Sequence, residues 1–454
     1  MNPALLVIYA AVMLITSLHL TFKSRTGDKF VTFIISYWIL AHSVLGAGIF
    51  TIRIGGLPFD LQAGRIIFLL FISYILILFL KDSFKNTERV KILKHEFILF
   101  LYVLVSIFVS YLHDRDVVSG KEFILRNIPI LSFLVYYLVL KKTADSPMVQ
   151  VLVKSMLILC TVSSVIGIYQ MLGNQRFFRL TELRFAFGGF FRSTGVFAAE
   201  YTQSYFLISG LILALFTVPS RLLRRFLVGL YALGIIFTFH RMSWITLAVL
   251  FLLFFIVVKK ELPKLVVIGA SAFILVVCLA IFLSPQIERL KSSDLYRSRL
   301  TDRTMDSRMR INKMIFRNIH KSWLIGFGSR DSDMYYFGML EADLGIDWAR
   351  GEVGGIHNGF LIELFFKGVI VFVLYIAFFI YAFDYFRHLG RFTHVVFYFA
   401  VFELTKFVLA NMTNGFNLGT ALGLLLAMFL GMNAAVYSKG IYLDNEIFDK
   451  IPPR

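Results

Sequence analysis

Long apolar stretches, joined by short polar connections, make up most of the chain. Many of these stretches reach or approach the roughly 20 residues that an α-helix needs to cross the hydrocarbon core of a bilayer. The pattern predicts about thirteen spans, with a range of about 12–14, and therefore an all-α integral membrane protein. The predicted spans comprise residues 3–22, 30–50, 65–80, 96–112, 123–140, 150–172, 201–218, 225–239, 242–258, 264–284, 357–384, 392–411 and 417–437.

One polar interval, residues 285–355, is far longer than the other connections. We expect a large, partly helical extracytoplasmic loop there, because its sequence DSRMRINKMIF reads as an amphipathic helix. With this loop and the predicted spans, the chain has five predicted parts. They are N-terminal transmembrane helices in 1–172, central transmembrane helices in 173–284 with an Arg-rich outer segment in 173–200, the loop in 285–356, C-terminal transmembrane helices in 357–437, and a cytoplasmic tail in 438–454.

Composition supports the membrane assignment, since 58% of the residues are hydrophobic and 16% are charged. Soluble domains have about 45–50% apolar and about 25% charged residues. The net charge of +18 is scattered between the predicted spans, which argues against a nucleic-acid partner. Cys160 and Cys278 each lie in an apolar run without CxxC spacing, so we interpret them as core residues. The first apolar stretch follows no basic residues, and we interpret it as a retained span and not as a signal peptide.

Basic residues alternate between the two sets of connections. Eighteen Lys and Arg lie in one set and five lie in the short connections of the other. Because cytoplasmic loops are enriched in Lys and Arg, the first set is predicted to be cytoplasmic. The N-terminus is then outside and the tail inside, which agrees with an odd number of spans. The predicted cytoplasmic connections are residues 23–29, 81–95, 141–150, 219–225, 259–264 and 387–391.

Two longer segments, residues 173–200 and 285–355, fall on the predicted outer side although they are rich in Arg. Residues 173–200 hold Arg176, Arg179, Arg184 and Arg192 with Phe between them. These side chains could snorkel to lipid headgroups from an amphipathic surface segment. Alternatively they could form an anion site, because guanidinium groups match phosphate oxygens in two parallel hydrogen bonds.

Four pieces of the predicted outer side could carry chemistry. They are Arg192 in RSTGVFAAE, Arg241 in FHRMSW, Arg308 in DSRMRINKMIF, and the pair His357 and Asn358. A histidine can act as a general base near neutral pH. The alternative for His357 is a residue at a helix start that is hydrogen-bonded in the headgroup layer.

Glu363 and Lys367 follow in the first turns of the next span, four residues apart. This spacing favours an ion pair within a helix. Ionisable groups inside a membrane are expensive and often functional, so a supporting role at the site also stays open. Glu403 and Lys406 repeat the pattern in the following span.

The order of these pieces resembles the O-antigen ligase and O-antigen polymerase superfamily of bacterial membrane glycosyltransferases. The shared order is an Arg-x-x-Gly segment, an Arg near Ser between two spans, an outer loop with Ser-Arg and then Gly-x-Gly, and a His-Asn pair opening a span. In the ligase pattern, nine residues separate the pair from a Gly, and two more separate that Gly from a Gly, Thr or Tyr. His357, Asn358 and Gly368 fit, whereas Val371 departs, and the resemblance covers residues 160–435.

A second family motif, Arg-x10-Gly, is described for the polymerases in two outer loops. This chain has Arg184 with Gly195 in one outer segment and Arg317 with Gly328 in the other. The resemblance therefore adds Arg184 and Arg317 as supporting residues, and the departure at Val371 favours a polymerase over a ligase.

What the resemblance implies is a glycosyltransferase-C-like bundle that works without a metal ion or another cofactor. It implies an inverting transfer from an oligosaccharide on undecaprenyl pyrophosphate, in a bacterial inner membrane with the active site facing the periplasm. Arg192, Arg241 and Arg308 would stabilise the pyrophosphate leaving group, and His357 would take the proton of the acceptor hydroxyl.

The implied partners are the lipid-linked donor, a glycan or lipid–sugar acceptor, membrane lipids and a chain-length regulator protein. A surface polysaccharide polymerase is the first interpretation, and a ligase that transfers the glycan to lipid A core is the second. A flippase for lipid-linked glycans is a third, although transporters tend to show internal repeats, and we find none. A membrane assembly scaffold without activity is also compatible with the sequence.

Overall fold

The computed structural model describes fifteen stretches of the chain. They are residues 3–45, 51–52, 61–62, 66–74, 77, 92–115, 119–181, 183, 191–254, 303–328, 356, 358–389, 394–414, 416 and 418–438.

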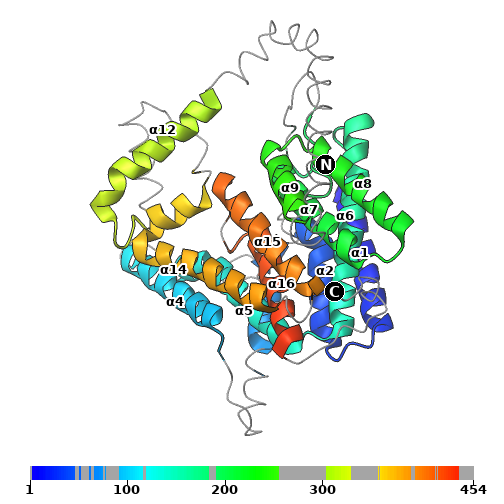
Figure 1. The fold of residues 1–454 in the computed structure, drawn as a ribbon, viewed down its shortest axis with the longest axis horizontal. Coiled ribbons are helices and arrows are strands. Elements are labelled where there is room, and N and C mark those ends of the chain that lie inside the picture. Colours follow the sequence, from blue (N-terminus) through cyan, green and yellow to red (C-terminus); the bar gives the residue numbers. More distant parts are fainter. Residues whose placement is uncertain are drawn as a thin grey trace, which may run out of the picture.

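Helices occupy the predicted positions wherever the chain is described. Figure 1 shows them packed side by side in a bundle, with α12 projecting from it. The bounds are α1 Pro3–Lys23, α2 Lys29–Leu45, α4 Lys94–Asp114, α5 Gly120–Thr143, α6 Ser146–Leu172, α7 Glu200–Thr217, α8 Arg221–Phe237, α9 Arg241–Leu253, α12 Arg303–Asn318, the 3₁₀ helix η2 Ile319–Ser322, α14 Gly359–Leu389, α15 His394–Thr413 and α16 Ala421–Ser438. Residues 66–74 are also helical.

Four of the described helices are long and apolar enough to cross a membrane. They are Ala4–Lys23, Lys94–His113, Ser146–Leu172 and Gly359–Phe386. Shorter apolar helices cover Lys29–Ala41, Arg241–Leu253 and Ala421–Ala435. The protein is thus helical and rich in candidate membrane spans, whereas the number thirteen stays a prediction. The predicted span 264–284, most of the predicted loop and the tail beyond residue 438 lie outside the described residues.

A small antiparallel pair of strands adds to the all-α prediction. β1 (Thr51–Ile52) pairs with β2 (Leu61–Gln62), with Thr51 opposite Gln62. The pair lies in the connection between two predicted spans, where short strands leave no apolar run for a sequence pattern to detect.

The core between the helices is apolar and rich in aromatic rings. Tyr102, Phe133, Phe206 and Phe378 are among the largest fully buried side chains. Cys160 is buried, and its Sγ donates to the carbonyl of Phe206 at 3.3 Å, as expected for a small core residue.

The helix α14 is broken, which corrects the prediction of one continuous span over residues 357–384. Gly368 has φ 77° and ψ 179°, far from helical values. The Phe360 ring lies 5.7 Å from Tyr375 and 6.4 Å from Phe379. A straight helix would separate Phe360 and Phe379 by about 28 Å along its axis. Residues 359–367, the first arm, therefore fold back beside the second arm.

The second arm, residues 369–389, is about 30 Å long, which is enough to cross a bilayer by itself. The first arm of α14 is then a short helix that returns into the bundle and begins directly after Asn358. Asn358 consequently lies at the tip of this arm, and not at the point where the long span begins.

Residues 323–328 of the large loop pair with α14 at the break. In a continuous helix the carbonyl of Phe365 would accept a hydrogen bond from the N–H of Val369. Instead, Val369 N donates to Trp323 O at 2.8 Å, and Phe327 N donates to Phe365 O at 3.0 Å. The loop thus satisfies the backbone groups that the break sets free, which a buried backbone requires.

Candidate functional site

The Arg-x-x-Gly segment between α6 and α7 is fixed by a buried glutamine. The Oε1 atom of Gln170 accepts from the backbone N–H groups of Thr194 at 2.9 Å and Gly195 at 3.0 Å. Its Nε2 donates to the Gly195 carbonyl at 3.1 Å. Gly195 has φ +54°, and a Cβ there would meet Ser163 Oγ at 2.2 Å, so the position requires glycine.

Further bonds tie the same segment to α7 and α8. Ser193 Oγ donates to Gln203 Oε1 at 3.2 Å, and Gln203 Nε2 donates to the Ser163 carbonyl at 3.3 Å. Ser193 N donates to the Phe237 carbonyl at the end of α8, at 3.0 Å. The backbone next to Arg192 is therefore held by three helices at once.

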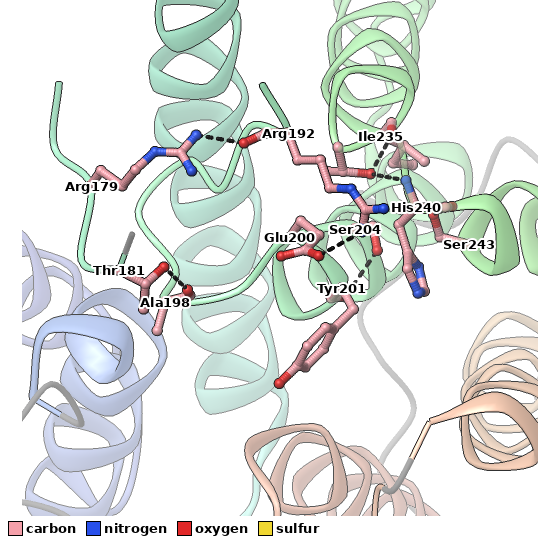
Figure 2. A network of polar contacts seen from close by, with 11 residues as sticks. Arg179, Thr181, Arg192, Ala198, Glu200, Tyr201, Ser204, Ile235, His240 and Ser243 are labelled. Atoms are coloured by element: carbon pink, nitrogen blue, oxygen red, sulfur yellow. Dashed lines mark hydrogen bonds and ion pairs between the residues drawn. The ribbon is translucent and has the colours of Figure 1, made fainter. Parts of the chain in front are cut away.

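Arg192 itself forms an ion pair in this structure. Its Nη1 lies 2.9 Å from Glu200 Oε1, and the two side chains are 35% and 4% exposed (Figure 2). The Nε atom of Arg192 is buried and has no hydrogen-bond partner among the described residues. Arg179 Nη2 donates to the Arg192 carbonyl at 2.5 Å. Burial lowers the pKa of the Arg179 guanidinium, and the Glu200 carboxylate acts in the opposite direction.

The turn between α8 and α9 is a tight one that presents His240 and Arg241. Phe239 has φ +49°, a left-handed conformation that costs a non-glycine residue about 1–2 kcal/mol. Ser243 Oγ donates to the His240 carbonyl at 2.7 Å, which closes the turn. Arg241 is exposed and opens α9, where the partial positive charge of a helix N-terminus also favours an anion.

Aromatic rings link this turn to the far end of the chain. The His240 ring lies 6.3 Å from Tyr201 and 5.6 Å from Tyr205. The same two tyrosine rings lie 5.5 Å and 5.7 Å from Phe416. Tyr205 Oη also accepts from Asn414 Nδ2 at 3.4 Å. Figure 2 shows Tyr201 and His240 beside the pair of Arg192 and Glu200.

The start of the first arm lies against this aromatic group. A Cβ on Gly359 would meet Asn411 Oδ1 at 1.6 Å and the Phe416 carbonyl at 2.2 Å, so the two segments touch. Asn358 Oδ1 accepts from Phe360 N at 3.0 Å and from Leu361 N at 3.2 Å. The Asn358 side chain therefore caps the first arm, and its supporting role at the site stays a prediction.

The spacing of Glu363 and Lys367 predicted an ion pair, and this is confirmed. Lys367 Nζ lies 2.8 Å from Glu363 Oε2, which also accepts from Tyr102 Oη at 3.0 Å. Glu363 is fully buried, and its Oε1 has no partner among the described residues. Glu403 and Lys406 pair in the same way at 2.5 Å, both 1% exposed.

Some predicted site residues are not placed by the structure. His357 and Arg184 lie outside the described residues. Arg308 lies on α12, where the backbone alone is described, and Arg317 on the same helix is exposed. The predicted convergence of Arg192, Arg241 and Arg308 on one anion therefore stays a prediction.

The helix that carries Arg308 nevertheless packs close to the start of the first arm. A separate apolar cluster joins three residues of α12 to the start of α14. Its buried members are Ile311, Met314, Ile315, Ile356, Leu361 and Phe365. Ile356 directly precedes His357, so α12 lies beside the tip of the first arm.

Sequence reasoning missed Glu200, Tyr201, Tyr205 and His240. A weak signal existed for two of them, because His240 directly precedes Arg241 and Glu200 closes the segment RSTGVFAAE. Within the described residues, no group of three or more His, Cys, Asp or Glu side chains could hold a metal ion.

Comparison with known proteins agrees with the resemblance given by the motifs. A family model described as O-antigen ligase matches residues 226–376, which include Arg241, α12 and the pattern from His357 to Gly368. No curated protein matches the chain. The matched region and the apolar helices together indicate a multi-pass membrane protein of glycosyltransferase type. This match over residues 226–376 supports the resemblance of the chain to the O-antigen ligase and O-antigen polymerase superfamily.

Proposed function

We propose that the protein transfers a glycan from undecaprenyl pyrophosphate to an acceptor hydroxyl, with inversion and without a metal ion, at the outer face of the bacterial inner membrane. The observation that carries this proposal is a series of contacts at one end of the bundle. The pair of Arg192 and Glu200 adjoins Tyr201, whose ring contacts both His240 and Phe416, and the Phe416 backbone touches Gly359. These contacts gather two cationic segments and the start of the first arm.

The arginines act on the leaving group in this scheme. As the glycosidic bond breaks, negative charge grows on the pyrophosphate oxygen, and fixed guanidinium groups stabilise it. Arg241 is exposed, whereas Arg192 is bound to Glu200. Because the Arg192 side chain is 35% exposed, its guanidinium stays accessible to a phosphate oxygen while Glu200 orients it.

His357 accepts the proton of the attacking hydroxyl in the same scheme. Inversion requires attack on the face of the sugar opposite the pyrophosphate, so the base and the arginines act from opposite sides of the anomeric carbon. The capped first arm fixes the backbone next to His357 through Asn358. A general base contributes about 10²–10⁴-fold to the rate.

A polymerase is our first choice between the two acceptors. It must hold a growing chain and a repeat unit, both on polyprenyl pyrophosphate, and two Arg-bearing segments could serve them. Residues 173–200 and 285–355 are the two segments of this kind.

A ligase is the second candidate: one observation favours it, and a second removes an objection to it. The matched family model carries the description of an O-antigen ligase. Val371, which departs from the ligase pattern, is fully buried in the second arm of α14. A departure at a packing position changes the core of the bundle and leaves the polar groups around Gly359 untouched, so it weighs little against a ligase.

The deciding experiment gives the purified protein a lipid-linked repeat unit alone. A ladder of longer lipid-linked glycans supports the polymerase. Transfer that starts when a lipid A core acceptor is added supports the ligase. His357→Ala should abolish either product while the protein still binds the donor, and full activity of this variant would remove His357 from the mechanism. No transfer with either acceptor would overturn the proposal.

A further inference from the structure

One side of α12 carries exposed apolar and basic side chains that continue into the following residues. Lys313, Phe316, Arg317 and His320 follow the spacing i, i+3, i+4 and i+7, so they form one stripe. Together with two later residues they form what we call the basic–aromatic surface. It comprises Lys313, Phe316, Arg317, His320, Trp323 and Leu324.

The apolar members of this surface are exposed to an unusual extent. Phe316 is 59% exposed, Trp323 is 58% exposed and Leu324 is 45% exposed. Single exposed apolar residues are common, but a group of three interleaved with cations calls for an explanation.

The opposite stripe of α12 already provides the packing of this helix. Ile311, Met314 and Ile315 are 4%, 2% and 0% exposed and pack with Leu361 and Phe365 of the first arm. The basic–aromatic surface is therefore a second apolar face that the core does not use.

Backbone contacts fix the level of this surface relative to the spans. Trp323 O accepts from Val369 N, the first residue of the second arm, at 2.8 Å. His113 Nε2 lies 3.1 Å from the Ile325 carbonyl, and His113 ends the candidate span Lys94–His113. Trp323 and Leu324 thus lie where two spans end. Figure 1 shows α12 running across the direction of α4 and not along it.

We propose that the basic–aromatic surface binds the surface of the surrounding bilayer and engages anionic phospholipid headgroups. Phe316, Trp323 and Leu324 enter the boundary between headgroups and acyl chains, as Trp does in the aromatic belts of membrane proteins. Lys313 and Arg317 extend along this boundary and keep their charges at the phosphates. Anionic lipids attract such basic side chains within a Debye length of the membrane.

The charge of the surface decides between a bilayer and a second copy of this chain. A second copy in a symmetric contact would bring Lys313 and Arg317 against the same two cations, which repel one another. The anionic bilayer offers the complementary charge, and it is already present at the level where the two spans end.

The position of this surface also has a consequence for the site, which rests on the proposed function. α12 carries Arg308, and residues 323–328 pair with the break in α14. Binding of the basic–aromatic surface to the bilayer would hold both at headgroup level, which is also the level of a pyrophosphate on a polyprenyl lipid.

The test uses the emission of Trp323 in the full chain, reconstituted in bilayers of phosphatidylcholine and phosphatidylglycerol. Parallel bilayers contain a lipid brominated near the start of its acyl chain, which quenches tryptophan on contact. The contribution of Trp323 is the difference between the parent protein and Trp323→Phe. We expect brominated lipid to quench most of this contribution and aqueous iodide to leave it almost unchanged. Phe316→Trp in the Trp323→Phe background gives a second reporter on α12.

Charge variants separate the headgroup contact from apolar contact alone. The double change Lys313→Glu with Arg317→Glu should weaken the quenching by brominated lipid, whereas Lys313→Arg with Arg317→Lys should preserve it. Strong quenching by iodide and none by brominated lipid would place the surface in water and overturn the proposal. Lipid quenching that appears only on dilution of the protein in the bilayer would show that a second copy covers the surface, which also overturns it. Because no glycan is present, these outcomes are independent of the proposed function.

Discussion

Two glycine-bearing segments, residues 191–200 and 323–328, are attached to the helix bundle by different means. Buried side chains hold the first, chiefly the amide of Gln170 on Thr194 and Gly195. Backbone groups hold the second, because residues 323–328 take over the hydrogen bonds that α14 gives up at its break.

The difference determines which substitutions each segment tolerates. A side-chain anchor is lost when one polar residue becomes apolar, since the backbone it served is left buried without a partner. A backbone anchor is insensitive to most side chains but depends on the few positions with a left-handed conformation. In the second segment and its partner these are Gly326, Gly328 and Gly368.

The largest effect is expected at the backbone anchor, for Gly368→Ala. With φ +77° and ψ 179°, Gly368 adopts a backbone conformation that essentially only glycine tolerates and that costs another residue about 1–3 kcal/mol. In addition, the new Cβ would lie 2.3 Å from the Leu324 carbonyl, so residues 323–328 must move. We expect a large fall in the thermal melting temperature in detergent and loss of glycan transfer.

Gly229→Ala is the matched control, because Gly229 lies within α8 and a Cβ there meets nothing within 4 Å. Alanine is the better helix former by about 1 kcal/mol, so this variant should melt at or above the parent temperature. Equal melting of Gly368→Ala and the parent would show that the break in α14 does not depend on glycine.

Gln170→Leu tests the side-chain anchor. The change leaves the N–H groups of Thr194 and Gly195 without their acceptor, and each buried unsatisfied group costs about 1–3 kcal/mol. We expect a lower melting temperature and weaker donor binding, because Arg192 loses its fixed backbone. Gln150→Leu, a half-buried position on the same helix, serves as the control and should change little. Parent-like melting of Gln170→Leu would mean that other contacts are enough to hold the segment.

Asn358→Ala should have a smaller effect that is confined to the first arm. It removes the side chain that accepts from Phe360 N and Leu361 N, and loss of such a cap costs about 1 kcal/mol. Hydrogen exchange should then speed up at these two amides while the second arm exchanges as before. Asn358→Asp keeps the acceptor and should behave as the parent. Unchanged exchange in Asn358→Ala would show that the Asn358 cap does not stabilise the first arm.

Glu200→Gln is expected to have the smallest effect on stability. The Arg192 side chain is 35% exposed, so water weakens its attraction to Glu200, and pairs of this kind contribute about 1 kcal/mol or less. The effect should appear in anion binding instead, since the site gains one net positive charge. We expect stronger inhibition by inorganic pyrophosphate than in the parent, and weaker inhibition for Arg192→Gln. Identical inhibition of the parent, Glu200→Gln and Arg192→Gln would argue that Arg192 does not bind the pyrophosphate.

The apolar runs of the sequence determined where most helices lie. Residues 96–112 were predicted and Lys94–Asp114 is observed, while 150–172 was predicted and Ser146–Leu172 is observed. A run of apolar residues must be buried in the bundle or in lipid, and a helix satisfies its own backbone, so no distant partner is needed to specify it. The sequence also contained recognisable motifs around Arg192, Arg241 and Gly368. Its spacing predicted the ion pair of Glu363 and Lys367.

Only the tertiary structure decided that α14 turns back at Gly368 and that His240 meets Tyr201, Tyr205 and Phe416. Both arms of α14 are apolar, so their sequence looks like one long span. The break is stabilised by backbone groups of residues 323–328, which lie far away in the chain. Contacts of this kind join segments that are distant in sequence, and hydropathy or spacing within one segment carries no information about them.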